Sequence, residues 1–590
     1  MISRQIIKFN IWQKEHLSEV YLLYILALII GLLAGLSSFL LKSIVHRIDI
    51  FVSNFSIDNG VDLLYLIMPG IGILLTWLLF KYIIKDETKH GIPRILYVIS
   101  RLDGKMKYHK VFSSMLGGAL TAGFGGSVGL ESPIISSGAS YGSGVGQFFR
   151  LNFKTRTLLI GCGAAGAIAS IFTTPVAAVI FSLEVLMLDL TTASIIPLLI
   201  ASAAGAITSK MLAADAILFN FSSNSAFQLE NLPYYILLGI LSGLISLYFS
   251  HMHFKISALF KKLKSRTLIF TVGFVSLGLL IFLFPPLYGE GYDIIRLIID
   301  GRADAALDQS FFAHFSDNTW VLLLFFSLLI FLKVIATSIT IEAGGIGGIF
   351  APSAITGGML GFVFARFTNL LRGSDALNEG NFTLVGMSAV LAAILHAPLT
   401  AMFLIVEMTN GYSLIVPLMI TISIAYITNK KYSSHSIFHK ELADSGDLIT
   451  HHKDKSVLTL LQVKHVIDRD LKIIAPQANL EDLIHLIAGS KRNIFPVVDE
   501  SGIYHGLVDL DDVRKDMFDL SLRSRPISDY IMQAKEHVSL MNSMEEVMEK
   551  FKKTGYYNLP VIHNNKYIGF VSRANIFTSY RKILNELSDE

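Results

Sequence analysis

The apolar stretch PVAAVIFSLE (Pro175–Glu184) has a counterpart later in the chain, PLTAMFLIVE (Pro398–Glu407). In each copy the glutamate follows the proline by nine positions. Upstream of each copy lies an apolar stretch rich in Gly and Ser. It opens with GLESP (Gly129–Pro133) in the first half and with GIFAP (Gly348–Pro352) in the second. Two halves of matching layout are typical of membrane domains with inverted repeats. The sequence therefore predicts an all-α polytopic membrane domain with two inverted-topology repeats.

The composition supports a membrane location. Of the 590 residues, 52% are hydrophobic and 16% are charged, whereas soluble domains have about 25% charged residues. We count about ten apolar segments, each about long enough to cross a bilayer as a helix and some broken by Gly or Pro. Clear examples without a charge are 21–41, 232–250, 267–288 and 411–428. We expect a multi-pass protein surrounded by lipid.

Charge and cysteine usage restrict the partners and the compartment. The net charge of +3 is too small to suggest a nucleic-acid partner. The single cysteine, Cys162, excludes an intrachain disulfide. Basic segments at the N-terminus, at Lys255–Arg266 and at 429–431 predict cytoplasmic termini, and the polar stretch Gly289–Asn318 is placed outside. Few cysteines and no cleavable signal fit a bacterial inner membrane.

The chain changes character near Lys430, where charges become frequent and apolar runs short. We place the membrane domain at residues 1–442 and a soluble α/β tail at 443–590. The tail contains two copies of one unit, at about 462–517 and 526–583. Each copy begins a helix with a capping-box pattern, at Asn479–Asp482 and at Ser543–Glu546, and places a proline and a short strand after it.

Three short segments place glycines before a proline that fits the first turn of a helix: HGIP (His90–Pro93), GLESP and GIFAP. A helix that begins inside the membrane presents unpaired N–H groups and a partial positive charge. Several such helix starts would bind an anion without the fixed charge that would hold it too tightly. The alternative is that these are ordinary Gly-Pro helix breaks.

Glu131 is an acid within an otherwise uncharged run from Val111 to Gly146. An intramembrane carboxylate is costly and indicates function. Ionised, it would occupy the anion's place, and protonated, it would swing away and open the path. The alternative is a structural acid held by a neighbour. For Glu184 and Glu407 we predict an architectural role in capping or packing, and we interpret His396 and Lys333 as satisfied polar residues.

These motifs resemble those of the CLC family of chloride channels and proton-coupled chloride exchangers. The matching stretches are KHGIP, GLESP, GIFAP, GEGYD (Gly289–Asp293) and the run from Lys333 to Pro352. The resemblance extends over about residues 21–442, and the tail resembles the paired CBS domains found on many family members. It implies a homodimer with one pathway per subunit, chloride or a similar small anion as substrate, and Glu131 as the gate and proton acceptor.

The resemblance also implies an anion site. Its expected residues are His90, Gly91, Ile92, Gly129, Ile349, Phe350, Ser434 and Tyr432. His90 stands where the family has a serine, so a direct hydroxyl contact is absent there. Ser434 aligns with a late pore tyrosine of the family, and Tyr432 is a nearby substitute.

Val185 occupies the position of a second, internal proton-accepting glutamate of the well-known bacterial exchangers. Because valine cannot carry a proton, we expect voltage- or pH-gated chloride transport by a passive channel. A proton-coupled chloride antiporter is the alternative. A more distant alternative is a membrane receptor, sensor or enzyme that uses the tail. No nucleophile–base set and no metal-ligand spacing is present, so we expect neither an enzyme nor a metal site.

The tail has a candidate nucleotide site. CBS domains that bind adenine nucleotides often combine a Ser or Thr with an Asp three positions later. Here the first copy offers Asp509 and Asp512, and the second offers Ser572 and Asn575. Neither copy has both residue types, so the alternative is a module for packing and dimerisation. We expect no required cofactor.

Overall fold

The computed structural model describes residues 18–54, 64–86, 91–188, 191–212, 227–308, 310–315, 318–373, 376–409, 411–444, 461–490, 492–534, 536–564 and 566–588. The chain divides into two compact units, Met1–Ser445 and Gly446–Glu590. The first unit is helical and the second combines helices with short strands, which confirms the predicted fold class.

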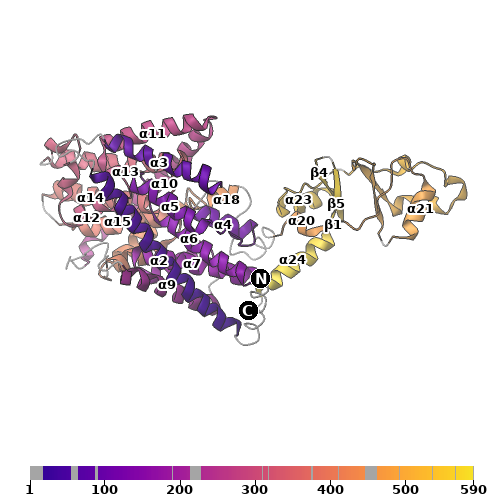
Figure 1. Cartoon of the computed structure of the whole chain (residues 1–590), viewed down its shortest axis with the longest axis horizontal. Helices are drawn as coiled ribbons and strands as arrows, with labels where there is room; N and C mark the ends of the chain where they lie inside the picture. Colours follow the sequence, from indigo (N-terminus) through magenta and orange to yellow (C-terminus); the bar gives the residue numbers. More distant parts are fainter. Residues whose placement is uncertain are drawn as a thin grey trace. The chain divides into compact units, whose positions relative to one another are not determined.

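The first unit consists of helices packed in several layers (Figure 1). Its α-helices are α2 (Glu19–Ser53), α3 (Leu64–Leu78), α4 (Ile92–Arg101), α5 (Lys110–Gly123), α6 (Glu131–Phe148), α7 (Phe153–Phe172), α8 (Pro175–Glu184), α9 (Thr192–Leu212), α10 (Leu232–Lys261), α11 (Arg266–Leu283), α12 (Tyr292–Ile299), α13 (Thr319–Glu342), α14 (Phe350–Arg372), α15 (Glu379–Leu395), α16 (Pro398–Met408), α17 (Ile415–Lys430) and α18 (Lys440–Asp444). Short turns are η1 (Leu79–Ile84), η2 (Leu229–Asn231), η3 (Pro285–Leu287), η4 (Ala303–Leu307) and η5 (Ala313–Phe315).

Not every apolar segment becomes a spanning helix. Among the described residues, eight helical segments are long and apolar enough to cross a bilayer, and four further apolar helices, α8, α15, α16 and α17, are shorter. The 10-residue α8 is an example. At about 1.5 Å per residue it covers roughly half of a 30 Å hydrocarbon layer. An apolar helix of that length is too short to cross the layer by itself.

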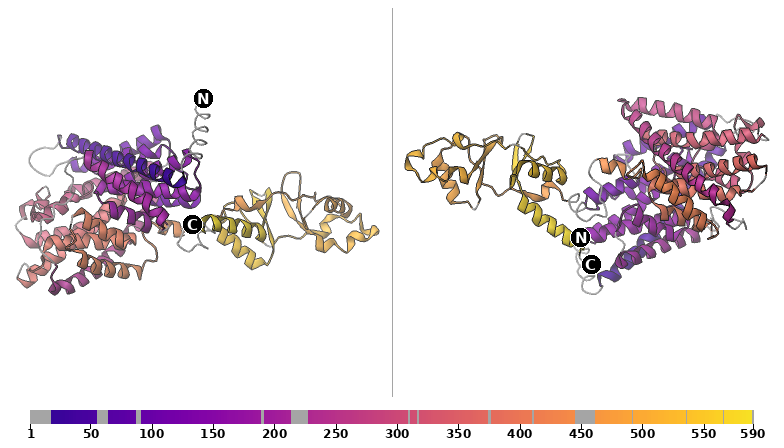
Figure 2. Two further views of the ribbon diagram at one scale, coloured as in Figure 1. Left: turned by 90° about the horizontal axis from the view of Figure 1, so that it is seen from below. Right: turned by 180° about the vertical axis from the view of Figure 1, so that it is seen from behind.

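The two halves repeat one packing arrangement. Helix α6 packs along α7, and α14 packs along α15 in the same way. The backbones touch at glycines, because a Cβ on Gly138 would collide with the Gly163 carbonyl and a Cβ on Gly357 with that of Gly386. Small residues allow this close approach of membrane helices. The views of Figure 2 show the same layered helical unit from two further directions.

Glu184 and Glu407 join the two repeats by reciprocal capping. The carboxylate of Glu184, at the end of α8, accepts the N–H groups of Leu399 (3.1 Å) and Thr400 (2.8 Å) and the Thr400 hydroxyl (2.7 Å). Glu407, near the end of α16, accepts the N–H groups of Val176 (3.0 Å) and Ala177 (2.8 Å). Each acid thus caps the first turn of the other repeat's helix. The predicted capping role is confirmed.

The second unit contains two small cores. Its elements are α20 (Val463–Val466), β1 (Ile467–Asp468), α21 (Leu480–Ala488), β2 (Ile494–Val498), β3 (Tyr504–Asp509), α22 (Leu510–Val513), η6 (Asp516–Phe518), η7 (Leu520–Leu522), η8 (Ile527–Tyr530), α23 (Met544–Thr554), β4 (Asn558–His563), β5 (Lys566–Ser572) and α24 (Arg573–Ser588). Strands β2 and β3 form an antiparallel pair, and β1, β5 and β4 form a three-stranded sheet in that order.

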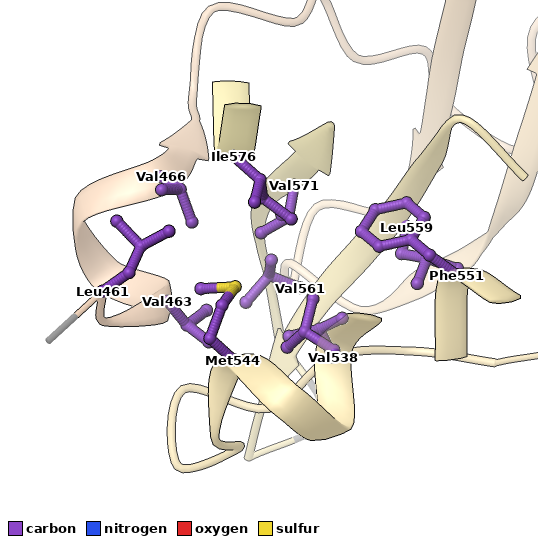
Figure 3. Packing of buried hydrophobic residues seen from close by; sticks show 11 residues of the cluster. Leu461, Val463, Val466, Val538, Met544, Phe551, Leu559, Val561, Val571 and Ile576 are labelled. Atoms are coloured by element: carbon purple, nitrogen blue, oxygen red, sulfur yellow. The ribbon is translucent and has the colours of Figure 1, made fainter. Parts of the chain in front are cut away.

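The two copies of the tail repeat in detail. Both predicted capping boxes are present, with Asn479 at the start of α21 and Ser543 at the start of α23. Gly506 pairs with Val497 and Gly569 pairs with Val561, and the strand register shifts after each pair. Figure 3 shows one of the two cores, where side chains from α20, α23 and the β4–β5 sheet meet around Val561.

Candidate functional site

Two helix starts, one from each half, are joined directly. Gly129 and Gly348 form a two-bond antiparallel bridge, with N–H···O distances of 2.9 and 2.8 Å. Two residues after each glycine a helix begins, α6 at Glu131 and α14 at Phe350. The bridge therefore fixes two helix N-termini side by side, where their partial positive charges add.

The third helix start meets the other two at serines of α6. Gly91 has φ of 87° and precedes α4, and its N–H donates to the Ser136 hydroxyl at 2.9 Å. A Cβ on Gly91 would collide with the Ser132 hydroxyl, and a Cβ on Gly348 would lie 2.6 Å from the Ser132 Cβ. Only glycine fits both positions. Ser132 and Ser136 are residues of this junction to which the sequence analysis gave no role, although Ser132 lies within GLESP and Ser136 in the Ser-rich run after it.

The predicted anion-site residues differ in whether their backbone N–H groups already have a hydrogen-bond acceptor. Ile92, Ile349 and Phe350 are buried at helix starts, where N–H groups have no intrahelical acceptor. The N–H groups of Gly91 and Gly129 already donate to the Ser136 hydroxyl and the Gly348 carbonyl. These two glycines thus shape the junction, and their role as anion ligands stays a prediction. His90 lies outside the described residues.

Glu131 lies at the centre of this junction with 0% exposure. Its Oε1 accepts the Tyr292 hydroxyl at 3.1 Å. Its buried Oε2 has no hydrogen-bond partner of ordinary geometry among the described residues and lies against the Cα of Gly129, near Ala351, whose backbone N–H acts on the carboxylate. A carboxylate oxygen in that position lies among helix starts that favour negative charge.

The segment Gly289–Tyr292 holds both the backbone and the side chain of this acid. Glu290 Oε1 accepts the Leu130 N–H at 3.0 Å, one residue before Glu131, and Tyr292 donates to Glu131 itself. The longer stretch Gly289–Asn318 stays predicted to lie outside, and within it residues 289–292 are half-buried and contact the start of α6. In the sequence, the GEGYD motif marked this segment as part of the family resemblance. It did not indicate that Glu290 and Tyr292 contact the start of α6.

Two lysines bring positive charge to the same region. Lys333 is 1% exposed, and its Nζ donates to the Ser127 hydroxyl at 3.0 Å and to the Gly289 carbonyl at 3.1 Å. Lys42 Nζ donates to the Ile171 carbonyl at 2.6 Å. Both ammonium groups interact electrostatically with Glu290. Lys333 is thus a satisfied polar residue, as predicted, and anchors the loop that contacts Glu131.

The tail positions proposed for a nucleotide act as helix caps. Asp509, at the end of β3, accepts the Asp511 N–H at 3.0 Å, and Asp512 is exposed. In the second copy Ser572, at the end of β5, accepts the Asn575 N–H at 3.0 Å. The two copies therefore place these residues equivalently, each at a strand-to-helix junction, and nucleotide binding stays a prediction.

A family model for voltage-gated chloride channels matches residues 71–430, and CBS-domain models match 463–519 and 527–582. The chain belongs to the voltage-gated chloride channel family. The membrane unit is thus the CLC-type unit that the motifs resembled, and the tail is a pair of CBS domains.

Relatives in this family carry both transporter and channel names. The H⁺/Cl⁻ exchange transporter ClcA of Vibrio cholerae is 27% identical over 67% of this chain and 84% of its own. A putative chloride channel protein, ClcB-like, of Ralstonia nicotianae is 25% identical over 65% of this chain and 86% of its own. A solved structure of a slow cyanobacterial Cl⁻/H⁺ antiporter is 25% identical, with a TM-score of 0.61, and covers 72% of this chain and 97% of that one.

The late positions that we predicted for the anion site lie in the turn after α17. Ser434 is exposed, and Tyr432 is 69% exposed, with its ring beside the Lys431 ammonium. The anion-site role of these two residues stays a prediction. The buried members of this turn are 436–439 instead. Within it, His439 donates to the carbonyl of Val185 at 3.1 Å.

Proposed function

We propose that the chain exchanges chloride for protons across a membrane, with Glu131 as the gate and proton acceptor. The observation that carries this proposal is the fully buried Glu131 carboxylate at the meeting point of helix starts from both halves, with one oxygen that has no side-chain donor among the described residues. An ionised carboxylate there has the charge of the transported anion and occupies its place.

The proposed cycle uses the two protonation states of Glu131. Ionised, the side chain closes the path and is held by the Tyr292 hydroxyl. Protonated, it loses the attraction of the helix N-termini and leaves, and chloride takes its place near the first N–H groups of α14, at Ile349 and Phe350. Each return of the carboxylate to its place releases a proton, which links the two fluxes.

The relatives support exchange better than the passive channel that Val185 suggested. Both the Vibrio cholerae relative and the solved cyanobacterial relative are named for the exchange of chloride and protons. The argument for a channel rests on one absent carboxylate at position 185. Another side chain can fill that role.

The test is a flux measurement on purified protein in liposomes. A tenfold chloride gradient stores about 1.4 kcal/mol. With charge balanced by a potassium ionophore, we expect this gradient to drive protons uphill and the reversal potential to shift with pH. Chloride flux without proton movement would support the passive channel instead. Potassium or sodium flux without chloride flux would contradict the anion site.

We further propose a homodimer in the bacterial inner membrane with both termini in the cytoplasm. Basic segments near α10 and at the end of α17 support this orientation. The paired CBS domains would then bind an adenine nucleotide in the cytoplasm and regulate transport.

A further inference from the structure

The side chain of His439 lies against the backbone of Val185. It is the last residue before α18 and is 4% exposed. Its Nε2 is 3.1 Å from the Val185 carbonyl and its Nδ1 is 2.6 Å from the Ser436 hydroxyl. Because a carbonyl only accepts, Nε2 carries the hydrogen, and in the neutral ring Nδ1 accepts from Ser436.

This pair of partners suits both protonation states of the imidazole. When Nδ1 gains a proton, it becomes a donor, and the Ser436 hydroxyl turns and accepts. The bond from Nε2 to the Val185 carbonyl is unchanged. The ring therefore gains and loses a proton without leaving either of its nitrogens without a hydrogen-bond partner.

We propose that His439 is the proton-binding group that replaces the missing carboxylate at position 185. The inference rests on the proposed exchange of chloride for protons. In the step itself, Ser436 gives its hydroxyl proton to the Nδ1 lone pair and takes a proton from a hydronium ion, which becomes water. Release reverses these transfers, and no other bond changes.

Burial opposes a positive charge on the His439 ring most strongly, and nearby positive charges oppose it further. Titratable and charged groups on the neighbouring elements are Glu184, His396, Lys430, His435 and Lys440. Of these, His396, His435 and Lys430 act on the His439 ring, and each opposes a positive charge there. The Glu184 carboxylate is held by the first turn of α16 and does not neutralise it. A group that passes protons must release them as readily as it binds them.

The test compares His439→Gln with His396→Gln in liposomes, with chloride and proton fluxes measured together. Glutamine keeps an N–H donor for the Val185 carbonyl and cannot bind a proton. We expect His439→Gln to keep chloride flux while protons moved per chloride fall by roughly tenfold or more. His396→Gln is the matched control, since His396 pairs with Asn429 instead, and it should keep the wild-type ratio.

Ser436→Ala is the second variant, for the case in which His439→Gln does not fold. It keeps the ring's bond to Val185 and removes the proton donor, so the proton-to-chloride ratio should fall. A wild-type ratio in His439→Gln or in Ser436→Ala would overturn the inference, as would an equal loss in His396→Gln. A wild-type protein that moves no protons would instead refute the proposed exchange.

Discussion

At the scale of single residues, Glu131 is the most informative side chain to change. Glutamine keeps its shape but removes its ionisation and its proton. We expect Glu131→Gln to abolish proton movement and to leave a chloride flux that no longer depends on pH, measured in liposomes between pH 5 and 8. Normal pH dependence in this variant would place the gate elsewhere.

Tyr292 supplies a second prediction at this scale. Its hydroxyl donates to Glu131, and hydrogen bonds to charged groups contribute about 1.5–3 kcal/mol. If this bond stabilises the closed position, Tyr292→Phe should raise chloride turnover by roughly tenfold or more. Tyr288→Phe is the matched control, because its buried hydroxyl has no hydrogen-bond partner in the described part of the chain. An equal effect in both variants would contradict a specific role for Tyr292.

At the scale of elements, the reciprocal caps of α8 and α16 decide how the repeats join. Glu184→Ala leaves two N–H groups and a hydroxyl without their acceptor, and Glu407→Ala leaves two N–H groups. A donor left unpaired away from water costs about 1–3 kcal/mol, and Glu184→Ala frees one donor more, the Thr400 hydroxyl, so we expect the larger loss of thermal stability in Glu184→Ala.

The measurement for this prediction is the Tm of detergent-purified protein. Glu19→Ala is a suitable control, because Glu19 is an exposed first-turn residue of α2. It should leave the Tm nearly unchanged. A larger loss in Glu407→Ala than in Glu184→Ala would contradict the ranking by donor count.

At the scale of the whole molecule, the tail should change transport when it binds its ligand. We expect titration of the full-length protein with AMP, ADP or ATP to release heat, and chloride flux to change with the nucleotide that binds. Asp509→Asn should weaken this binding, because it keeps the oxygen that caps α22 but removes the charge. Asp519→Asn, at the equivalent cap of η7, is the control. Heat signals that are absent for all three nucleotides would leave the tail a packing module.

The sequence by itself determined the helix starts, the repeats and the two-unit organisation. These features depend on local signals. A proline in a first turn, or a capping box such as those at Asn479 and Ser543, sets where a helix begins through residues only a few positions away. A long uncharged run likewise indicates a membrane helix without reference to any other part of the chain. The burial of Glu131 was predicted for the same reason, since it lies within an otherwise uncharged run from Val111 to Gly146.

Only the tertiary structure decided which side chains meet. Tyr292 and Glu131 lie 161 positions apart, and His439 and Val185 lie 254 apart. Such contacts depend on how whole helices pack against one another. Because packing depends on the complementary shapes of helices that are distant in the sequence, no local sequence pattern predicts it. For the same reason the anion-site role of Ser434 and Tyr432 stays a prediction, because what a turn packs against decides which of its residues are buried. The sequence predicted a capping or packing role for Glu184 and Glu407. Only the structure shows that each acid caps the helix of the other repeat.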